Sequence, residues 1–201
     1  MAGYPDSATS IGLTCIDGVV LASEKRVTWG DIILSKRGMK VFKITDKIGV
    51  ACAGLVSDMQ VLARRLEAIS NIYFMEEKKP IPVRTVAKIM ANILFDTRMY
   101  PLLTQTIVGG IDNKEGPAVY VLDPLGSILK EKYAAVGSGS YIAFGTLERF
   151  YKDGLTIDEG KEMAIKSIRA AAKRDIGSGE GIDIMTITNE GMNIESIEEI
   201  K

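Results

Sequence analysis

Histidine is absent from the 201 residues of this chain. Its absence excludes a Ser-His-Asp or Cys-His catalytic arrangement, and it also excludes a histidine-based zinc site. If the chain is a hydrolase, the group that takes the proton from its nucleophile must therefore be an amine or a carboxylate.

Cysteine is scarce, because the chain has only Cys15 and Cys52, each within an apolar stretch. Two thiols alone cannot build a structural zinc site, so we expect no metal and no other cofactor. We interpret both cysteines as buried side chains in a reducing compartment, which predicts a cytoplasmic protein.

Long apolar runs are also missing, since none approaches the roughly 20 residues that cross a bilayer. The N-terminal sequence MAGYPDS has neither the basic region nor the apolar stretch of a signal peptide. The 25 basic residues nearly balance the 26 acidic ones, so neither nucleic acid nor an anionic membrane is expected as a partner. The length and the apolar fraction of 46% suit one globular domain.

Short apolar segments bounded by turn residues predict strands, and Asp17-Gly18 is the strongest hairpin signal. The first two strands are apolar at nearly every position, which indicates that both of their faces are covered. The predicted strands are 10–16, 19–25, 39–44, 47–53, 104–111, 118–124, 127–136 and 182–188, followed by one last short segment.

Apolar residues at helical spacing predict two pairs of helices. Ser57 with Gln60 and Thr156 with Glu159 match capping boxes and predict where two of the helices begin. Pro82 falls where a first helical turn accepts proline, and residues 141–151 form a further predicted helix. Strands, two helices, strands, two helices and strands indicate an α+β domain, a four-layer αββα sandwich with two antiparallel sheets between helical layers.

Several polar residues and glycines stand at the ends of these elements. They are Glu24-Lys25-Arg26, Lys40, Ala53-Gly54, the GSGS loop at 137–140 and the run RDIGSGEGID at 174–183. Taken singly, each is an ordinary solvated strand end or a turn.

Taken together, the segments resemble a proteasome β-type subunit of the archaeal kind. The resemblance rests on SIGLTCIDGVVLASEKRVTWG, SKRGMKVFKI, VACAGLVSDMQVLARRLE, YAAVGSGS and RDIGSGEGIDI, and it runs from about Ala8 almost to the C-terminus. It implies the N-terminal-nucleophile hydrolase fold and a threonine-type endopeptidase complex, the proteasome. It also implies stacked seven-membered rings of α-type and β-type subunits, and unfolded protein substrates delivered by a regulatory ATPase. Residues 1–7 then correspond to a leader, and residues 8–201 to the domain.

The resemblance assigns roles to individual residues. In that family a threonine, exposed as the new N-terminus by self-cleavage, attacks the substrate, and its free α-amine takes the proton. Lys40 matches the lysine beside the nucleophile, and Glu24 matches the acid that pairs with it. Asp175 and Ser178 match the Asp and Ser that orient the terminus, Ser138 matches the serine of the GSG loop, and the Gly54 N–H matches the oxyanion donor. The residues matched to the substrate pocket are Val27, Gly38, Phe42, Cys52, Val56 and Gln60.

The sequence departs from this pattern at the nucleophile itself. Aligning Ile11-Gly12 and the distance to Lys40 places Ala8 where the threonine should be, and Ser7 replaces the glycine before the cleavage point. Alanine has no oxygen, so it can attack neither its preceding peptide bond nor a substrate. The chain is therefore expected to be a non-catalytic β-type subunit that completes the inner ring.

Three alternatives stay open at this stage. Thr9 or Ser10 could supply a shifted nucleophile, although Thr9 should point away from Lys40 and Ser10 lies roughly 6.6 Å further along the strand. Ala8 could also be a laboratory replacement of threonine in a catalytic subunit. A hydrolase acting on small amides is the third, but no cluster of residues for recognising a small molecule is visible.

Overall fold

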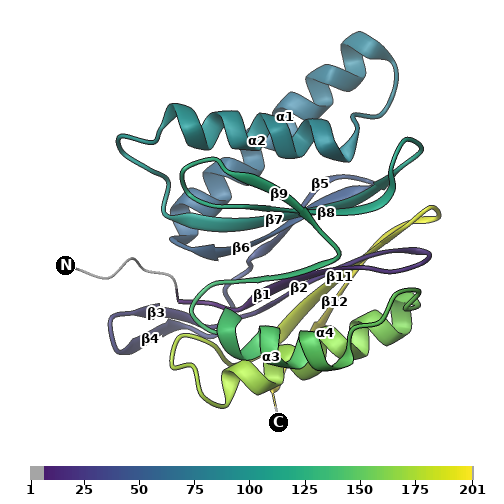
Figure 1. The fold of residues 1–201 in the computed structure, drawn as a ribbon. Helices are drawn as coiled ribbons and strands as arrows, with labels where there is room; N and C mark the ends of the chain where they lie inside the picture. Colours follow the sequence, from purple (N-terminus) through teal and green to yellow (C-terminus); the bar gives the residue numbers. More distant parts are fainter. Residues whose placement is uncertain (1–6, 201) are drawn as a thin grey trace.

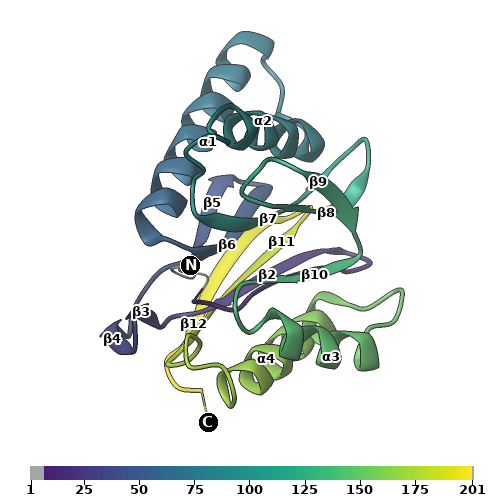
Figure 2. The same ribbon diagram turned by 60° about the vertical axis from the view of Figure 1, so that its left-hand side comes forward.

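The computed structural model describes residues 7–200, and these residues form four layers (Figure 1). Two antiparallel sheets lie face to face, and a pair of helices covers the outer face of each sheet (Figure 2). This is the predicted αββα sandwich. The predicted leader, residues 1–7, lies outside the described residues except for Ser7, and so does Lys201 at the other end.

The first sheet contains the start of the described chain. Its strands lie in the spatial order β10 (Tyr133–Val136), β1 (Ser10–Thr14), β2 (Gly18–Glu24), β11 (Ile182–Thr188) and β12 (Gly191–Ile197). Every residue of β2 is buried, because the other sheet covers one of its faces and helices cover the other.

The second sheet has the order β5 (Val41–Thr45), β6 (Ile48–Gly54), β7 (Thr104–Asp112), β8 (Gly116–Leu122) and β9 (Ile128–Glu131). A separate hairpin, β3 (Val27–Trp29) with β4 (Ile32–Ser35), follows β2 and projects at one end of the sandwich (Figure 1). The sequence did not predict this hairpin.

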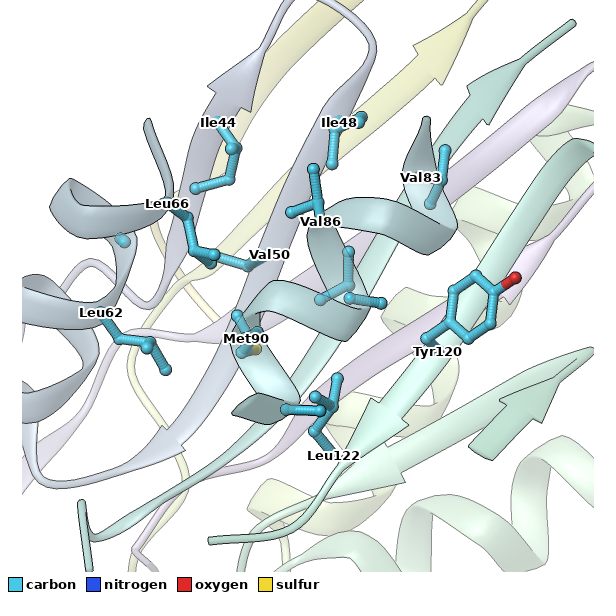
Figure 3. Packing of buried hydrophobic residues seen from close by; sticks show 14 of the residues in the cluster. Ile44, Ile48, Val50, Leu62, Leu66, Val83, Val86, Met90, Tyr120 and Leu122 are labelled. Atoms are coloured by element: carbon cyan, nitrogen blue, oxygen red, sulfur yellow. The ribbon is translucent and has the colours of Figure 1, made fainter. Parts of the chain in front are cut away.

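Helices α1 (Val56–Glu77) and α2 (Val83–Asp96) pack on the second sheet, and Figure 3 shows their apolar contacts with it. Helices α3 (Ser140–Phe150) and α4 (Ile157–Ala172) pack on the first sheet around a second cluster. A third cluster lies between the sheets, where a Cβ atom at Gly12 would come within 2.6 Å of Ile107. Glycine at that position therefore lets the sheets approach closely.

Three local predictions differ from the structure. Ser57 lies inside α1 and makes no capping box, because Leu55 adopts an extended conformation after Gly54 and starts the helix two residues earlier. Pro82 is the N-cap of α2 and not part of its first turn. The predicted strand 127–136 is two strands that belong to different sheets, since the chain crosses between the sheets at Lys132. The capping box of Thr156 and Glu159 is confirmed.

Within residues 7–200, no helix has the combination of length and apolar character that crossing a membrane requires.

Candidate functional site

The site forms where the start of β1 meets the end of β2. The carbonyl oxygen of Thr9 accepts hydrogen bonds from Glu24 N at 3.2 Å and from the Ser23 hydroxyl at 3.3 Å. On the other side, Gly139 N donates to Ala8 O at 3.3 Å. Ala8 is fully buried and belongs to the apolar cluster between the sheets. The backbone at position 8 is therefore held on both sides.

Glu24 and Lys40 form a buried ion pair at this junction. The exposed fraction of the surface is 0% for Glu24 and 1% for Lys40. Lys40 Nζ donates to Glu24 Oε1 and to the carbonyl oxygen of Arg26, the latter at 2.5 Å. Glu24 Oε2 accepts from the backbone N–H groups of Arg26 at 2.7 Å and of Gly179 at 3.0 Å. The pair thus connects β2, the residue before β5 and the loop that precedes β11.

Burial dominates the electrostatics of this pair. It raises the pKa of the Glu24 carboxyl and lowers the pKa of the Lys40 ammonium, because each charged form loses its hydration. The attraction between the two charges and the backbone N–H donors to Glu24 act in the opposite direction. A lysine of lowered pKa gives up its proton more readily than an exposed lysine does.

A second polar cluster surrounds the backbone N–H of Ala8. Asp175 Oδ2 accepts hydrogen bonds from the hydroxyls of Ser138 at 2.7 Å and Ser178 at 2.5 Å. Ala8 N donates to Ser138 Oγ at 3.3 Å, and the Thr9 and Ser178 hydroxyls share a hydrogen bond of 2.6 Å. The two residues matched to terminus-orienting groups, Asp175 and Ser178, therefore lie together with Ser138 at position 8.

The hydroxyls of Thr9 and Ser10 point to opposite sides of β1, as strand alternation predicts. Thr9 faces Ser178, and the Ser10 hydroxyl lies 2.7 Å from both Ser23 Oγ and Cys52 O. Both residues are fully buried. Each hydroxyl is thus already engaged within the core, and neither is hydrogen-bonded to Lys40.

A cavity of about 620 Å³ opens beside Lys40 and Gly54. Gly54 has φ of +130° at the turn from β6 into α1, a conformation that favours glycine. The other residues that line the cavity are Ser7, Arg26, Val27, Thr28, Trp29, Gly30, Leu34, Leu55, Val56, Ser57 and Leu103.

Of the six residues matched to the substrate pocket, only Val27 and Val56 line this cavity. Phe42 and Cys52 pack instead against the cluster beneath α1 and α2, and Gln60 lies on the exposed side of α1. Gly38 is beside Val27, and its N–H donates to Lys25 O at 2.8 Å.

Sequence reasoning missed the part of the cavity that Trp29, Leu34, Leu55 and Leu103 contribute. A signal for the first two was present, because Gly30-Asp31 between apolar residues is a two-residue hairpin pattern.

Within residues 7–200, no group of three or more carboxylate or thiol side chains is placed to hold a metal ion.

The four-layer fold agrees with what comparison with known proteins shows. The family described as "Proteasome subunit" matches residues 6–187. The chain belongs to the proteasome subunit family.

Its relatives are β-type subunits of archaea. It is 47% identical over 201 residues to proteasome subunit beta 1 of Nitrosopumilus maritimus, with both chains covered completely. It is 46% identical to proteasome subunit beta 1 of Cenarchaeum symbiosum, over 92% of this chain and 94% of the relative. Proteasome subunit beta of Methanosarcina mazei is 42% identical over 98% of this chain and 94% of its own length. The chain is therefore a β-type proteasome subunit, and membership of this family implies assembly with α-type and β-type subunits.

Proposed function

We propose that this chain is a non-catalytic β-type subunit of the 20S proteasome core particle. It would complete the inner ring, form part of the wall of the degradation chamber and support catalytic neighbours. The observation that carries the proposal is a methyl group at position 8, the position that the family resemblance matches to the nucleophile, beside the hydrogen-bonded Ser138 and Asp175.

The chemistry of the site supports this reading. Peptide hydrolysis by this type of enzyme needs an alcohol oxygen whose proton can be taken by the α-amine of the same residue. Ser138 accepts a hydrogen bond from the backbone nitrogen of position 8 and donates one to Asp175, and Glu24 pairs with Lys40. Because Ala8 provides no oxygen, these groups have nothing to activate. Loss of a nucleophile lowers turnover by several orders of magnitude even when the other groups stay in place.

A shifted nucleophile is less compatible with the geometry. Thr9 and Ser10 are fully buried and hydrogen-bonded to Ser178, and to Ser23 and Cys52, respectively. A substrate carbonyl would have to enter the core to reach either hydroxyl. The engineered alternative is weakened by Ser7, because a single designed Thr→Ala replacement would not also remove the preceding glycine.

The partners follow from the same proposal. We infer that α-type and β-type subunits assemble with this chain in stacked seven-membered rings, and that a regulatory ATPase delivers unfolded proteins to the chamber. The free, buried Cys15 and Cys52 are compatible with the cytoplasm as the place of action.

The intact mass of the purified, assembled chain tests the missing nucleophile. We expect a mass that begins at Met1 or Ala2, because no hydroxyl is available to cleave the bond between Ser7 and Ala8. The matched control is the Ser7→Gly/Ala8→Thr variant, which should lose its first seven residues. A mass of the unsubstituted chain that begins at Ala8, Thr9 or Ser10 would refute the proposal.

A further inference from the structure

The side chain of Arg26 fastens the loop between α4 and β11. Its guanidinium group donates to the carbonyl oxygen of Ile176 at 2.8 Å and to Glu180 Oε1 at 3.2 Å. The same group lies directly against the backbone of Gly179, where a Cβ atom would overlap with it. The planar fork of an arginine suits this double contact, because its two ends reach two partners in a fixed geometry. Arg26 therefore holds the loop at three places.

Glu180 completes this contact in an unusual backbone conformation. Its φ is +68°, in a region that is uncommon for residues other than glycine. Such a conformation persists only where neighbouring groups fix it. Here the carboxylate pairs with Arg26 and, at 3.6 Å, with Lys36, and the carbonyl oxygen accepts from Ile200 N at 2.7 Å. The Arg26 and Glu180 side chains are only 22% and 19% exposed, whereas the Lys36 side chain is 69% exposed, so Arg26 is the stronger partner.

The loop that Arg26 and Glu180 fix carries groups of the candidate site. Within it, Ser178 N donates to Asp175 O at 3.2 Å, and Gly177 N donates to Asp175 Oδ1 at 3.3 Å. Gly179 N donates to Glu24 Oε2 at 3.0 Å. The position of the loop therefore affects both the polar cluster around Asp175 and the buried ion pair of Glu24.

Position 8 depends on where this loop lies. Ser138 connects Ala8 N to Asp175, to which it donates at 2.7 Å. A Cβ atom at Gly177 would come within 2.9 Å of Ser7 Cβ, so the loop also packs closely against the residue before position 8. A misplacement of about 1 Å in such a site can cost on the order of a hundredfold in rate.

We propose that Arg26 and Glu180 are positioning residues, whose ion pair fixes this loop and so holds Asp175 and Ser178 at position 8. The inference rests on the proposed function, because it takes position 8 as the place where an N-terminal nucleophile would act. The rival interpretation gives Arg26 a role only in the wall of the cavity, which it lines. Glu180 is not among the residues that line the cavity, so its substitution separates the two interpretations.

Hydrogen exchange in the otherwise unsubstituted full chain tests whether the pair fixes the loop. The variants are Arg26→Met and Glu180→Met, and the matched control is Lys36→Met, which removes the exposed partner of the same carboxylate. We expect the amides of residues 175–181 to exchange about tenfold faster in the first two variants, with no change in β7. The control should exchange as the unsubstituted chain does. Equal exchange of the loop in all four proteins would overturn the proposal.

Kinetics test whether the fixed loop matters for the chemistry. The same three substitutions are made in the Ser7→Gly/Ala8→Thr variant, which is assembled with α-type subunits and given a hydrophobic fluorogenic peptide. We expect Arg26→Met and Glu180→Met to lower kcat about 10–100-fold and to leave KM within about twofold, whereas Lys36→Met should change neither.

The two single variants should also be coupled. Combining Arg26→Met with Glu180→Met should lower kcat by less than the product of the two single effects, because both remove the same ion pair. A higher KM for Arg26→Met with no effect of Glu180→Met would indicate a role in the cavity wall and refute the inference. An inactive Ser7→Gly/Ala8→Thr particle would also refute it, because the loop would then not hold position 8 in a reactive arrangement.

Failure of this inference can be told apart from failure of the proposed function. An unsubstituted chain that keeps its first seven residues by mass, combined with unchanged exchange of the loop in the variants, would refute only the positioning role. An unsubstituted chain whose mass begins at Ala8, Thr9 or Ser10 would refute the proposed function, whatever the exchange shows.

Discussion

Replacement of Lys40 by methionine tests whether this buried lysine stabilises the folded subunit. Lys40→Met leaves a side chain of similar volume at position 40, but it removes the charged partner of Glu24, whose side chain is fully buried. Glu24 would retain only two backbone N–H donors, from Arg26 and Gly179. The carboxylate must then either stay charged in the core or take up a proton.

The size of the effect follows from that burial. Breaking a buried ion pair on one side costs about 3–5 kcal/mol, which for a domain of this size lowers Tm by about 6–20 °C. The matched control is Lys43→Met, because Lys43 is 53% exposed in its side chain and pairs with the exposed Asp46. We expect the control to change the free energy of unfolding by less than about 0.5 kcal/mol.

Thermal and urea unfolding of the free chain, followed by circular dichroism, measure both variants. Adding Glu24→Gln to Lys40→Met should recover about 0.5–3 kcal/mol, since the neutral amide oxygen still accepts from the backbone donors. If Lys40→Met is no more destabilising than Lys43→Met, or if the two changes at positions 24 and 40 are simply additive, the structural role is refuted.

Three further predictions concern buried and partly buried groups. Thr9→Val should lower the free energy of unfolding by about 1–3 kcal/mol, because the Ser178 hydroxyl loses a fully buried hydrogen-bond partner. Chemical denaturation measures this change, and the control Thr9→Ser should retain most of the stability. Burial raises the pKa of Cys15 and Cys52 to about 12, so neither should react with a disulfide reagent at pH 8 until the chain unfolds, and rapid labelling of the native protein would contradict this. A hydrogen bond from Lys130 lowers the pKa of Glu115, so the folded state binds fewer protons at this group, and its stabilisation is present above the ordinary pKa of 4.5 and lost as pH falls. Glu115→Gln should therefore reduce stability at pH 7 by no more than about 1 kcal/mol and make no difference in strong acid, and unfolding curves across this pH range test it.

The alternation of secondary structure was readable because local patterns and packing agree in most of this chain. A hairpin does join β1 to β2, although its turn is Ile16-Asp17 and not Asp17-Gly18, since Cys15 N donates to Gly18 O at 2.8 Å and Gly18 begins β2. The apolar character of the start of 19–25 reflects a strand that is buried on both faces. Thr156 with Glu159 forms the capping box that the spacing predicts. In these places a short-range signal is sufficient.

The misreadings occur where distant residues decide the local structure. Residues 127–136 look like one strand, but 128–131 pair with β8 and 133–136 pair with β1, and no local signal distinguishes these partners. The start of α1 depends on Leu55, whose N–H donates to Leu103 O, a residue far along the chain.

In the site, too, distant residues decide which side chains meet. Nothing in the periodicity indicates that Lys40 meets Glu24 or that Asp175 meets Ser138, and only the family resemblance suggested these neighbours. The structure brings both pairs together. The cavity was harder to anticipate, because most of its apolar wall comes from a hairpin and from a loop that precedes β7.

Cleavage of a peptide substrate tests the missing oxygen at position 8 most directly. The decisive measurement assembles α-type subunits with this chain as the sole β-type subunit and follows cleavage of a hydrophobic fluorogenic peptide. We predict turnover at background, with activity several orders of magnitude higher when the β-type subunit is the Ser7→Gly/Ala8→Thr variant. Turnover by the unsubstituted particle at a rate comparable to that of the variant would contradict the account.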